Sequence, residues 1–264
     1  MLGDVAVHRP AIVSRLRAAG CVFAEDEARL LVSAARTSAD LAVLVDRRIA
    51  GIPLEHVLGW AEFCGMRIAV EPGVFVPRRR TEFLVRQAAA LAGRRAVVVD
   101  LCCGSGAVGA ALVAALGRIE LHAVDIDPAA VRCARRNVGA GGHVYEGDLY
   151  EPLPTVLRGR VDVLVANAPY VPTDAVDLLP AEARIHEPRV ALDGGADGLD
   201  VQRRVAAAAL LWLAPGGHLL VETSERQAPM TVESFARSGL IPRVAGSDEL
   251  SATVVIGTGV ALHG

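Results

Sequence analysis

The fold is decided by the stretch VVVDLCCGSGAVG, which runs from Val97 to Gly109. Its apolar start predicts a buried strand, its glycines predict a tight turn, and its small apolar end predicts a helix. Gly104, Gly106 and Gly109 fit the pattern G-x-G-x-x-G, in which backbone N–H groups at the start of a helix approach a ligand closely. We therefore expect a cradle for a nucleotide-like cofactor at this turn.

Apolar strands and helical stretches alternate from Thr81 onward. The predicted strands lie at residues 96–101, 120–126, 143–146, 161–167 and 218–222. This alternation indicates a parallel sheet wrapped by helices, and therefore the α/β class. Two last strands, within residues 239–245 and 251–256, are joined by a short polar loop and predict a terminal antiparallel hairpin.

The N-terminal part of the chain has a different pattern. Pro10 opens a predicted helix that ends at Gly20, and Ser38 can cap another. Residues 60–76 turn strand-like on both sides of a glycine, which predicts a hairpin. The sequence thus predicts a small all-α domain at residues 1–58, a β-hairpin connector at residues 59–79 and an α/β domain at residues 80–264.

The composition excludes several classes of protein. With 264 residues, 52% of them hydrophobic, the chain is able to bury a large core. The net charge of −3 and the pI near 6.2 provide no general attraction to nucleic acid. All 27 basic residues are arginines, so no lysine is available for Schiff-base or P-loop chemistry.

The five cysteines are scattered and lack C-x-x-C spacing, which argues against a zinc site and against a disulfide framework. The sequence has no signal-peptide pattern and no uninterrupted apolar run of about 18 residues. We therefore expect a cytoplasmic protein with no metal, no membrane segment and no stably bound nucleic acid.

Three acidic residues stand near the ends of predicted strands. Asp125 can accept hydrogen bonds from both hydroxyls of a ribose, or it can merely cap the helix that begins at Pro128. This spacing suits NAD and S-adenosylmethionine equally. Asp100 would repel a pyrophosphate but can meet the amino acid portion of S-adenosylmethionine or its positive sulfur. Asp148 can accept from the exocyclic amine of adenine or only stabilise a turn. We favour S-adenosylmethionine, with cofactor-binding residues Asp100, Cys102, Gly104, Gly106, Gly109, Asp125, Ile126, Asp148, Leu149 and Asn167.

A second motif, Asn167-Ala168-Pro169-Tyr170, follows the apolar run at residues 161–166. It places an amide side chain where a buried strand opens into a loop, which suits a site that grips a planar NH2 group. The alternative is structural, because Asn after a strand often caps the next element and Tyr often packs on its own loop. Together with the cofactor cradle, the motif indicates methyl transfer to nitrogen.

Residues from about 59 to 227 resemble the release-factor glutamine methyltransferases, the HemK-like family. The resemblance comes in separate blocks, and the most specific of them is the last. The blocks are GWAEFCG at residues 59–65 for G-x-x-x-F-x-G, VPRRRTE at 76–82 for I-P-R-P-E-T-E, the cofactor loop at 100–109, NAPY at 167–170 for N-P-P-Y, and residues 187–200 for E-P-x-x-A-L-x-G-G-x-D-G-L.

The resemblance implies a Rossmann-like class I methyltransferase domain with a mostly parallel seven-stranded sheet. It also implies that the helical domain engages a bacterial release factor, and that the catalytic domain methylates the glutamine of its Gly-Gly-Gln loop. In that scheme the Asn167 oxygen and the Ala168 carbonyl each accept one N–H of the substrate amide, and Tyr170 stacks on it. Pro169 completes the catalytic motif, Arg78 joins the substrate-binding residues, and the protein is a monomer.

The sequence departs from the family pattern at several positions. Ala168 stands where the family has Pro, and Arg79 and Arg80 stand where it has Pro and Glu, which reverses the local charge. The segment from Glu222 to Gln227 keeps the Glu and Gln of E-I-G-x-x-Q but lacks its Gly. Three alternatives stay open: a nucleic-acid base methyltransferase acting on a flipped base, a non-catalytic cofactor-binding relative, and a dehydrogenase.

Overall fold

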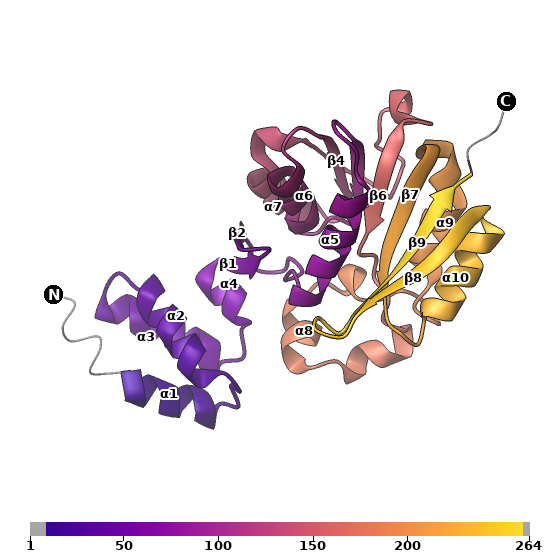
Figure 1. Cartoon of the computed structure of the whole chain (residues 1–264). Coiled ribbons are helices and arrows are strands. Elements are labelled where there is room, and N and C mark those ends of the chain that lie inside the picture. The colour runs from indigo at the N-terminus through magenta and orange to yellow at the C-terminus, as the bar shows by residue number, and fades with distance from the viewer. Residues whose placement is uncertain (1–8, 261–264) are drawn as a thin grey trace.

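The computed structural model describes residues 9–260, so the ends of the predicted domains, residues 1–8 and 261–264, lie outside the described residues. Figure 1 shows a group of helices at the N-terminal side, a short hairpin, and a large sheet flanked by helices. The domain boundaries after residues 58 and 79 stay our proposal. No helix among residues 9–260 is long and apolar enough to cross a membrane.

Between residues 9 and 58, four helices pack around a core of their own that includes Leu16, Leu31 and Val45. They are α1 (Arg9–Ala18), α2 (Ala24–Ala34), α3 (Ser38–Ile49) and α4 (Leu54–Leu58). The expected cap at Ser38 is wrong by one residue. Thr37 has an extended backbone, and its Oγ1 accepts a hydrogen bond from the backbone N–H of Asp40 at 3.1 Å, which satisfies a free donor of the first turn.

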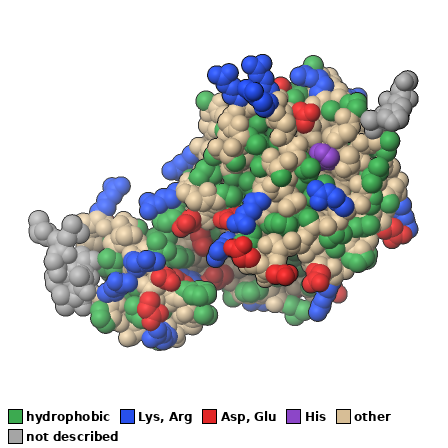
Figure 2. Space-filling view, in the orientation of Figure 1, with side chains coloured by type: hydrophobic (Ala, Val, Ile, Leu, Met, Phe, Trp, Pro, Cys, Tyr) green, Lys and Arg blue, Asp and Glu red, His purple; other side chains and the backbone are tan. Residues whose placement is uncertain are grey.

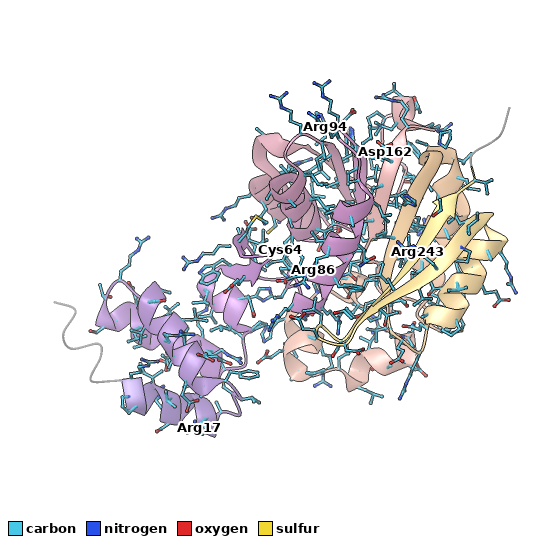
Figure 3. All side chains as sticks on the ribbon, in the orientation of Figure 1. Arg17, Cys64, Arg86, Arg94, Asp162 and Arg243 are labelled. Atoms are coloured by element: carbon cyan, nitrogen blue, oxygen red, sulfur yellow. The ribbon has the colours of Figure 1, made fainter. Side chains whose placement is uncertain are left out.

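The connector is a β-hairpin, as the sequence predicts. Strands β1 (Trp60–Phe63) and β2 (Met66–Ala69) pair in antiparallel fashion through a turn at Cys64 and Gly65, both with positive φ. Figure 3 shows Cys64 near α5 (Glu82–Leu91), and its backbone N–H donates to the Glu82 carboxylate at 2.9 Å. Phe63 is fully buried in the core of the α/β part, so the hairpin is anchored on it.

The sheet has seven strands in the order β5-β4-β3-β6-β7-β9-β8. The strands are β3 (Val97–Leu101), β4 (Glu120–Asp125), β5 (His143–Glu146), β6 (Val161–Ala166), β7 (Leu213–Thr223), β8 (Leu240–Ser247) and β9 (Ala252–Gly259). The first five are parallel, and β8 and β9 form the antiparallel hairpin at one edge. The predicted fold class is confirmed.

Helices cover both faces of this sheet, giving three layers (Figure 1). One face packs against α5, α6 (Ala107–Leu116) and α7 (Pro128–Val138), and the other packs against α9 (Asp200–Trp212) and α10 (Ala228–Arg237). The remaining elements are the short helix α8 (Ala181–His186) and 3-10 turns at Arg79–Thr81, Gly139–Gly141, Thr155–Leu157, Thr173–Leu178 and Arg189–Ala191. Strand order reverses between β3 and β6, which is where ligands bind in open α/β sheets.

An ion-pair network joins the helical part to the α/β part. The Arg48 guanidinium on α3 donates to the Glu27 carboxylate on α2 and to the Glu182 carboxylate on α8, each at 2.6 Å. Figure 2 shows charged side chains of both signs where the two parts meet. The side chains of Arg48 and Glu27 are about nine-tenths buried, so this contact is well shielded from water.

Candidate active site

A cavity of about 630 Å³ opens at the carboxyl ends of β3, β4 and β6. All three parts of the chain line it: Pro53 and Glu55 from the helical part, Phe75 from the connector, and the loops after the strands. Of the fourteen predicted site residues, twelve lie on its wall. These are Arg78, Asp100, Cys102, Gly104, Asp125, Ile126, Asp148, Leu149, Asn167, Ala168, Pro169 and Tyr170.

The other two, Gly106 and Gly109, do not line the cavity. Gly106 has a φ of 75°, and a Cβ added to it would lie 3.0 Å from the Ala134 Cα on α7. A Cβ on Gly109 would lie 2.9 Å from Leu121 Cδ2 on β4. These glycines therefore let α6 pack closely behind the turn, and only Gly104 of the three borders the ligand space.

Asp125 shapes the glycine turn. Its Oδ2 accepts a hydrogen bond from the Gly104 N–H at 2.8 Å, and its Oδ1 accepts from the Asp127 N–H at 2.9 Å. Capping of α7 falls to Asp127, whose Oδ1 accepts from the Ala129 N–H at 2.8 Å. Asp125 is thus not a mere helix cap, and with the half-exposed Ile126 it forms one side of the cavity.

Asp100, on β3, is a buried acid at the cavity wall. Its Oδ2 accepts from the Gly109 N–H at 2.9 Å, and it forms no ion pair within residues 9–260. Burial, assisted by the negative charge of Asp125, raises the pKa of Asp100 to about 7. A buried carboxyl that lacks a cationic partner fits a cationic ligand, so this wall suits the sulfonium cofactor.

Asp148 forms an ion pair with Arg204, a residue that lies outside the sequence motifs. Its Oδ2 accepts from Arg204 Nη2 at 2.6 Å, and Arg204 also lines the cavity. The two positions are 56 residues apart and no motif contains Arg204, so no signal in the sequence pointed to it.

Burial raises the pKa of the nearby Cys102 thiol, which makes it an inert lining residue.

The loop after β6 lies beside the cofactor turn. Ala166, the last residue of β6, pairs with Leu101 of β3, so Asn167 and Cys102 leave adjacent strands side by side. Asn167 Nδ2 is 3.3 Å from Thr81 Oγ1, within hydrogen-bond distance. Asn167 Oδ1 makes no hydrogen bond to the residues that the structure describes, and Asn167 is one of the residues that line the cavity.

Tyr170 is held from two sides. Its hydroxyl accepts a hydrogen bond from Arg80 Nη2, and the Arg80 guanidinium lies 5.7 Å from the centre of its ring. Its backbone carbonyl accepts from Gln227 Nε2 at 2.8 Å. Arg80 Nε also donates to Glu222 Oε1 at 3.2 Å. Arg80, which stands where the family pattern has Glu, is therefore neutralised by an ion pair with Glu222 beside the cavity.

Arg78 is paired as well. Its Nη2 lies 2.6 and 2.7 Å from the two oxygens of Glu187, whose side chain is only 1% exposed. Glu187 Oε1 also accepts from the Val76 N–H at 3.1 Å. The direct contact of Arg78 with a substrate stays a prediction, and the structure adds that Arg78 joins the connector to the block at residues 187–200.

The glycines of that block lie against the loop after β6. A Cβ on Gly194 would be 2.6 Å from the Pro169 carbonyl oxygen, and one on Gly198 would overlap the Tyr170 carbonyl oxygen. Val171 pairs with Asp193 in a parallel β-bridge. The glycine spacing is therefore explained by close packing of two loops that shape one wall of the cavity.

The fold and the site can be compared with known proteins. The family model described as a methyltransferase small domain matches residues 65–201. A crystal structure of a methyltransferase from Pyrococcus furiosus is similar with a TM-score of 0.55 and 16% identity, over 85% of this chain and 100% of that one. At this identity the likeness shows the fold alone.

Two curated relatives extend the comparison. The chain is 40% identical over 217 residues to the release factor glutamine methyltransferase of Geobacter sulfurreducens, covering 81% of this chain and 75% of the relative. It is 36% identical over 203 residues to a 4-amino-L-phenylalanine/4-methylamino-L-phenylalanine methyltransferase of Streptomyces pristinaespiralis, covering 74% and 69%. The chain therefore belongs to the release factor glutamine methyltransferase family, whose methyl donor is S-adenosylmethionine.

Proposed function

We propose that this protein transfers the methyl group of S-adenosylmethionine to the side-chain amide nitrogen of a glutamine in a peptide chain release factor. The observation that carries the proposal is the position of Asn167. Its amide borders the cavity beside the cofactor turn, Nδ2 is engaged by Thr81, and Oδ1 is left for a ligand. The 40% identity to the Geobacter sulfurreducens protein, named for this activity, supports it.

A carboxamide nitrogen is a poor nucleophile because its lone pair is delocalised into the carbonyl, so the site has to orient it. We assign Asn167 Oδ1 to accept one N–H of the substrate and the backbone carbonyl of Ala168 to accept the other. Pro169 and Tyr170 complete this wall, with the Tyr170 ring held by Arg80. Orientation and exclusion of water provide the rate, and the product amide loses its proton to solvent or to a carbonyl.

The cofactor, when bound, supplies an electrophilic methyl group. We assign the sulfonium side to Asp100 and the ribose to Asp125, both on the cavity wall. Asp148 and Leu149 are assigned to the adenine, and Cys102, Gly104 and Ile126 to its surroundings. We further propose that the protein works as a monomer in the cytoplasm.

The Streptomyces pristinaespiralis relative supports a second candidate, methyl transfer to an amino group on a small aromatic molecule. The two departures at the cavity wall, Ala168 and Arg80, are where a changed substrate would be accommodated. An aromatic amine and a glutamine amide both present a planar NH2 group, so the same Asn167 grip serves either one.

One labelling experiment separates these activities. The protein is incubated with methyl-labelled S-adenosylmethionine and a bacterial release factor, with 4-aminophenylalanine, or with RNA. We expect label on the release factor, lost when its Gly-Gly-Gln glutamine is changed and when Asn167→Ala is used. Asn167→Asp keeps an acceptor of the same shape and is the matched control for cofactor binding. Label on 4-aminophenylalanine alone supports the second candidate, and label on RNA alone contradicts both.

A further inference from the structure

One ion pair on the cavity wall joins α9 to the loop that follows β5. Arg204 Nη2 on α9 donates to Asp148 Oδ2 at 2.6 Å, and both residues line the cavity. Val201, three positions earlier on the same helix, lines it too. Because residues three apart share one side of a helix, α9 presents the side with Val201 and Arg204 to the ligand space.

The loop after β5 is also held on α9 by a second set of contacts. The Tyr150 hydroxyl donates to the Val205 carbonyl at 2.7 Å, and the Tyr150 ring stacks on Trp212 with the ring centres 5.6 Å apart. Leu149, Val205 and Trp212 belong to one buried core. The side chains of Arg204 and Asp148 are 55% and 31% exposed, and so exposed an ion pair adds little stability. Stability therefore does not account for the pair.

Within residues 9–260, the pair uses only part of the hydrogen-bonding capacity of its two side chains. Asp148 Oδ1 makes no hydrogen bond to the residues that the structure describes, and neither do Nε and Nη1 of Arg204. A carboxylate only accepts hydrogen bonds, and a guanidinium only donates them. The cavity wall thus carries an acceptor and a donor beside each other. Adenine has the complementary arrangement, because its N6 amine donates and the ring nitrogens N1 and N7 on either side accept.

We propose that Asp148 and Arg204 together recognise the adenine edge of S-adenosylmethionine, and that Arg204 is a binding residue for this cofactor. Asp148 Oδ1 accepts from the N6 amine, and an Arg204 N–H donates to the neighbouring ring nitrogen. The inference rests on the proposed function, because that places the adenine beside Asp148 and Leu149. It implies selection against a deaminated cofactor, whose O6 would set one acceptor against another.

The test of Arg204 measures binding by calorimetric titration. The ligands are S-adenosylhomocysteine and its 1-deaza and 7-deaza forms, each of which lacks one ring nitrogen. We expect one deaza form to bind wild type about tenfold more weakly than S-adenosylhomocysteine. Arg204→Met should weaken S-adenosylhomocysteine about tenfold and leave that deaza form unchanged, because its partner atom is already absent. Equal weakening of all three ligands overturns the inference, since Arg204 would then merely orient Asp148.

The neighbouring arginine on α9 provides the matched control. Arg203 pairs with Asp197 and Asp200 and does not line the cavity. Arg203→Met should therefore bind S-adenosylhomocysteine within about threefold of wild type. A tenfold loss in Arg203→Met as well would show that the effect comes from α9 as a whole, and would contradict a specific role of Arg204.

The test of Asp148 uses the deaminated ligand S-inosylhomocysteine. Wild type should prefer S-adenosylhomocysteine to it by about 100-fold. In Asp148→Asn, the amide oxygen can accept from Arg204 and the amide NH2 can donate to O6, so the preference should fall to within about threefold. A role confined to holding the loop would weaken both ligands equally and keep the preference. That result, or a wild-type protein without a preference, refutes the inference.

These measurements need no methyl acceptor, so they separate the inference from the proposed substrate. If the release factor is not methylated and the effects of Arg204→Met and Asp148→Asn appear, the proposed substrate fails and the inference stands. If wild type does not bind S-adenosylhomocysteine, the inference fails together with the assignment of the adenine to this wall.

Discussion

The Glu187 carboxylate, almost fully buried, takes up the guanidinium of Arg78 at 2.6 and 2.7 Å, and this pair fastens the connector to the loops around the cavity. The contact spans 109 residues of chain. It explains two of the sequence motifs, because the block at residues 76–82 supplies the arginine and the block at residues 187–200 supplies the acid.

Removal of the arginine should destabilise the fold. In Arg78→Met, the Val76 N–H is the one donor that Glu187 keeps among residues 9–260, while Glu187 stays buried. Because the Arg78 side chain is 36% exposed, we expect the free energy of unfolding to fall by about 1–3 kcal/mol rather than by the larger cost of a fully buried pair. Urea denaturation measures the change. The double variant with Glu187→Gln should recover part of the loss, and no recovery would contradict the pairing argument.

Cofactor affinity should depend on pH through Asp100. With its pKa raised to about 7, Asp100 is largely protonated at lower pH, and a cationic ligand has to displace that proton. Affinity for S-adenosylmethionine should therefore rise with pH by at most about tenfold per unit and level off above about pH 7. Calorimetric titration from about pH 5.5 to about pH 8.5 tests this.

The control is Asp100→Asn, which keeps an acceptor for the Gly109 N–H but does not titrate. At high pH its affinity for S-adenosylmethionine should be lower than that of the wild-type protein. That affinity should also not change with pH. The raised pKa of Asp100 also makes the stability of the fold depend on pH. Because the folded-state pKa exceeds the ordinary value, the stability gained from the bound proton is lost as pH rises from about 4 to about 7. A pH-dependent affinity in Asp100→Asn would place the titrating group elsewhere.

Gly106→Ala should lower stability without touching the ligand. The residue has a φ of 75°, and a methyl group would meet the Ala134 Cα at 3.0 Å, so backbone strain and a close contact add together. We expect a loss of about 1–3 kcal/mol in the free energy of unfolding. Gly93→Ala is the matched control, since nothing lies within 4 Å of its added Cβ. Equal effects of the two changes would contradict this account.

The network at Arg48 should matter far more than an ordinary surface pair. In Arg48→Met, the buried Glu27 loses its partner, and Glu182 loses the contact that joins α8 to the helical part. We expect the free energy of unfolding to fall by about 3–5 kcal/mol. Arg15→Met removes the exposed pair with Asp46 and should change it by less than about 1 kcal/mol. Thermal denaturation of both variants makes the comparison.

The sequence was sufficient for the sheet, the hairpin and twelve of the residues that line the cavity. Strand periodicity and the glycine turn are local signals, and they predicted the order of elements and the cradle that ends at Asp125. The error at the start of α3 is also local, because Thr37 and Ser38 are both good caps and only backbone conformation decides between them. Gly106 and Gly109 match a pattern whose positions serve packing as well as ligand approach.

The hydrogen-bond partners inside the site were beyond the sequence. Arg80 and Glu222 are 142 residues apart, and Asn167 and Thr81 are 86 apart. No periodicity links such positions, and the charge reversal at Arg80 looked like a change at the mouth of the site rather than one half of a pair. Such partners become visible only when folding brings β7, the connector and the loop after β6 to one edge of the sheet.

Pro53 and Glu55 limit how the helical part of this enzyme can be exchanged with that of a relative. Because these residues of the helical part form a piece of the cavity wall, the helices cannot be replaced without changing the site. A chimera that borrows the helices of a relative would also import part of the cavity wall. Recombination with a relative should therefore succeed when the exchanged segments include both the helices and the residue at the position of Glu182. When only the helices are exchanged, the cavity wall should be incomplete.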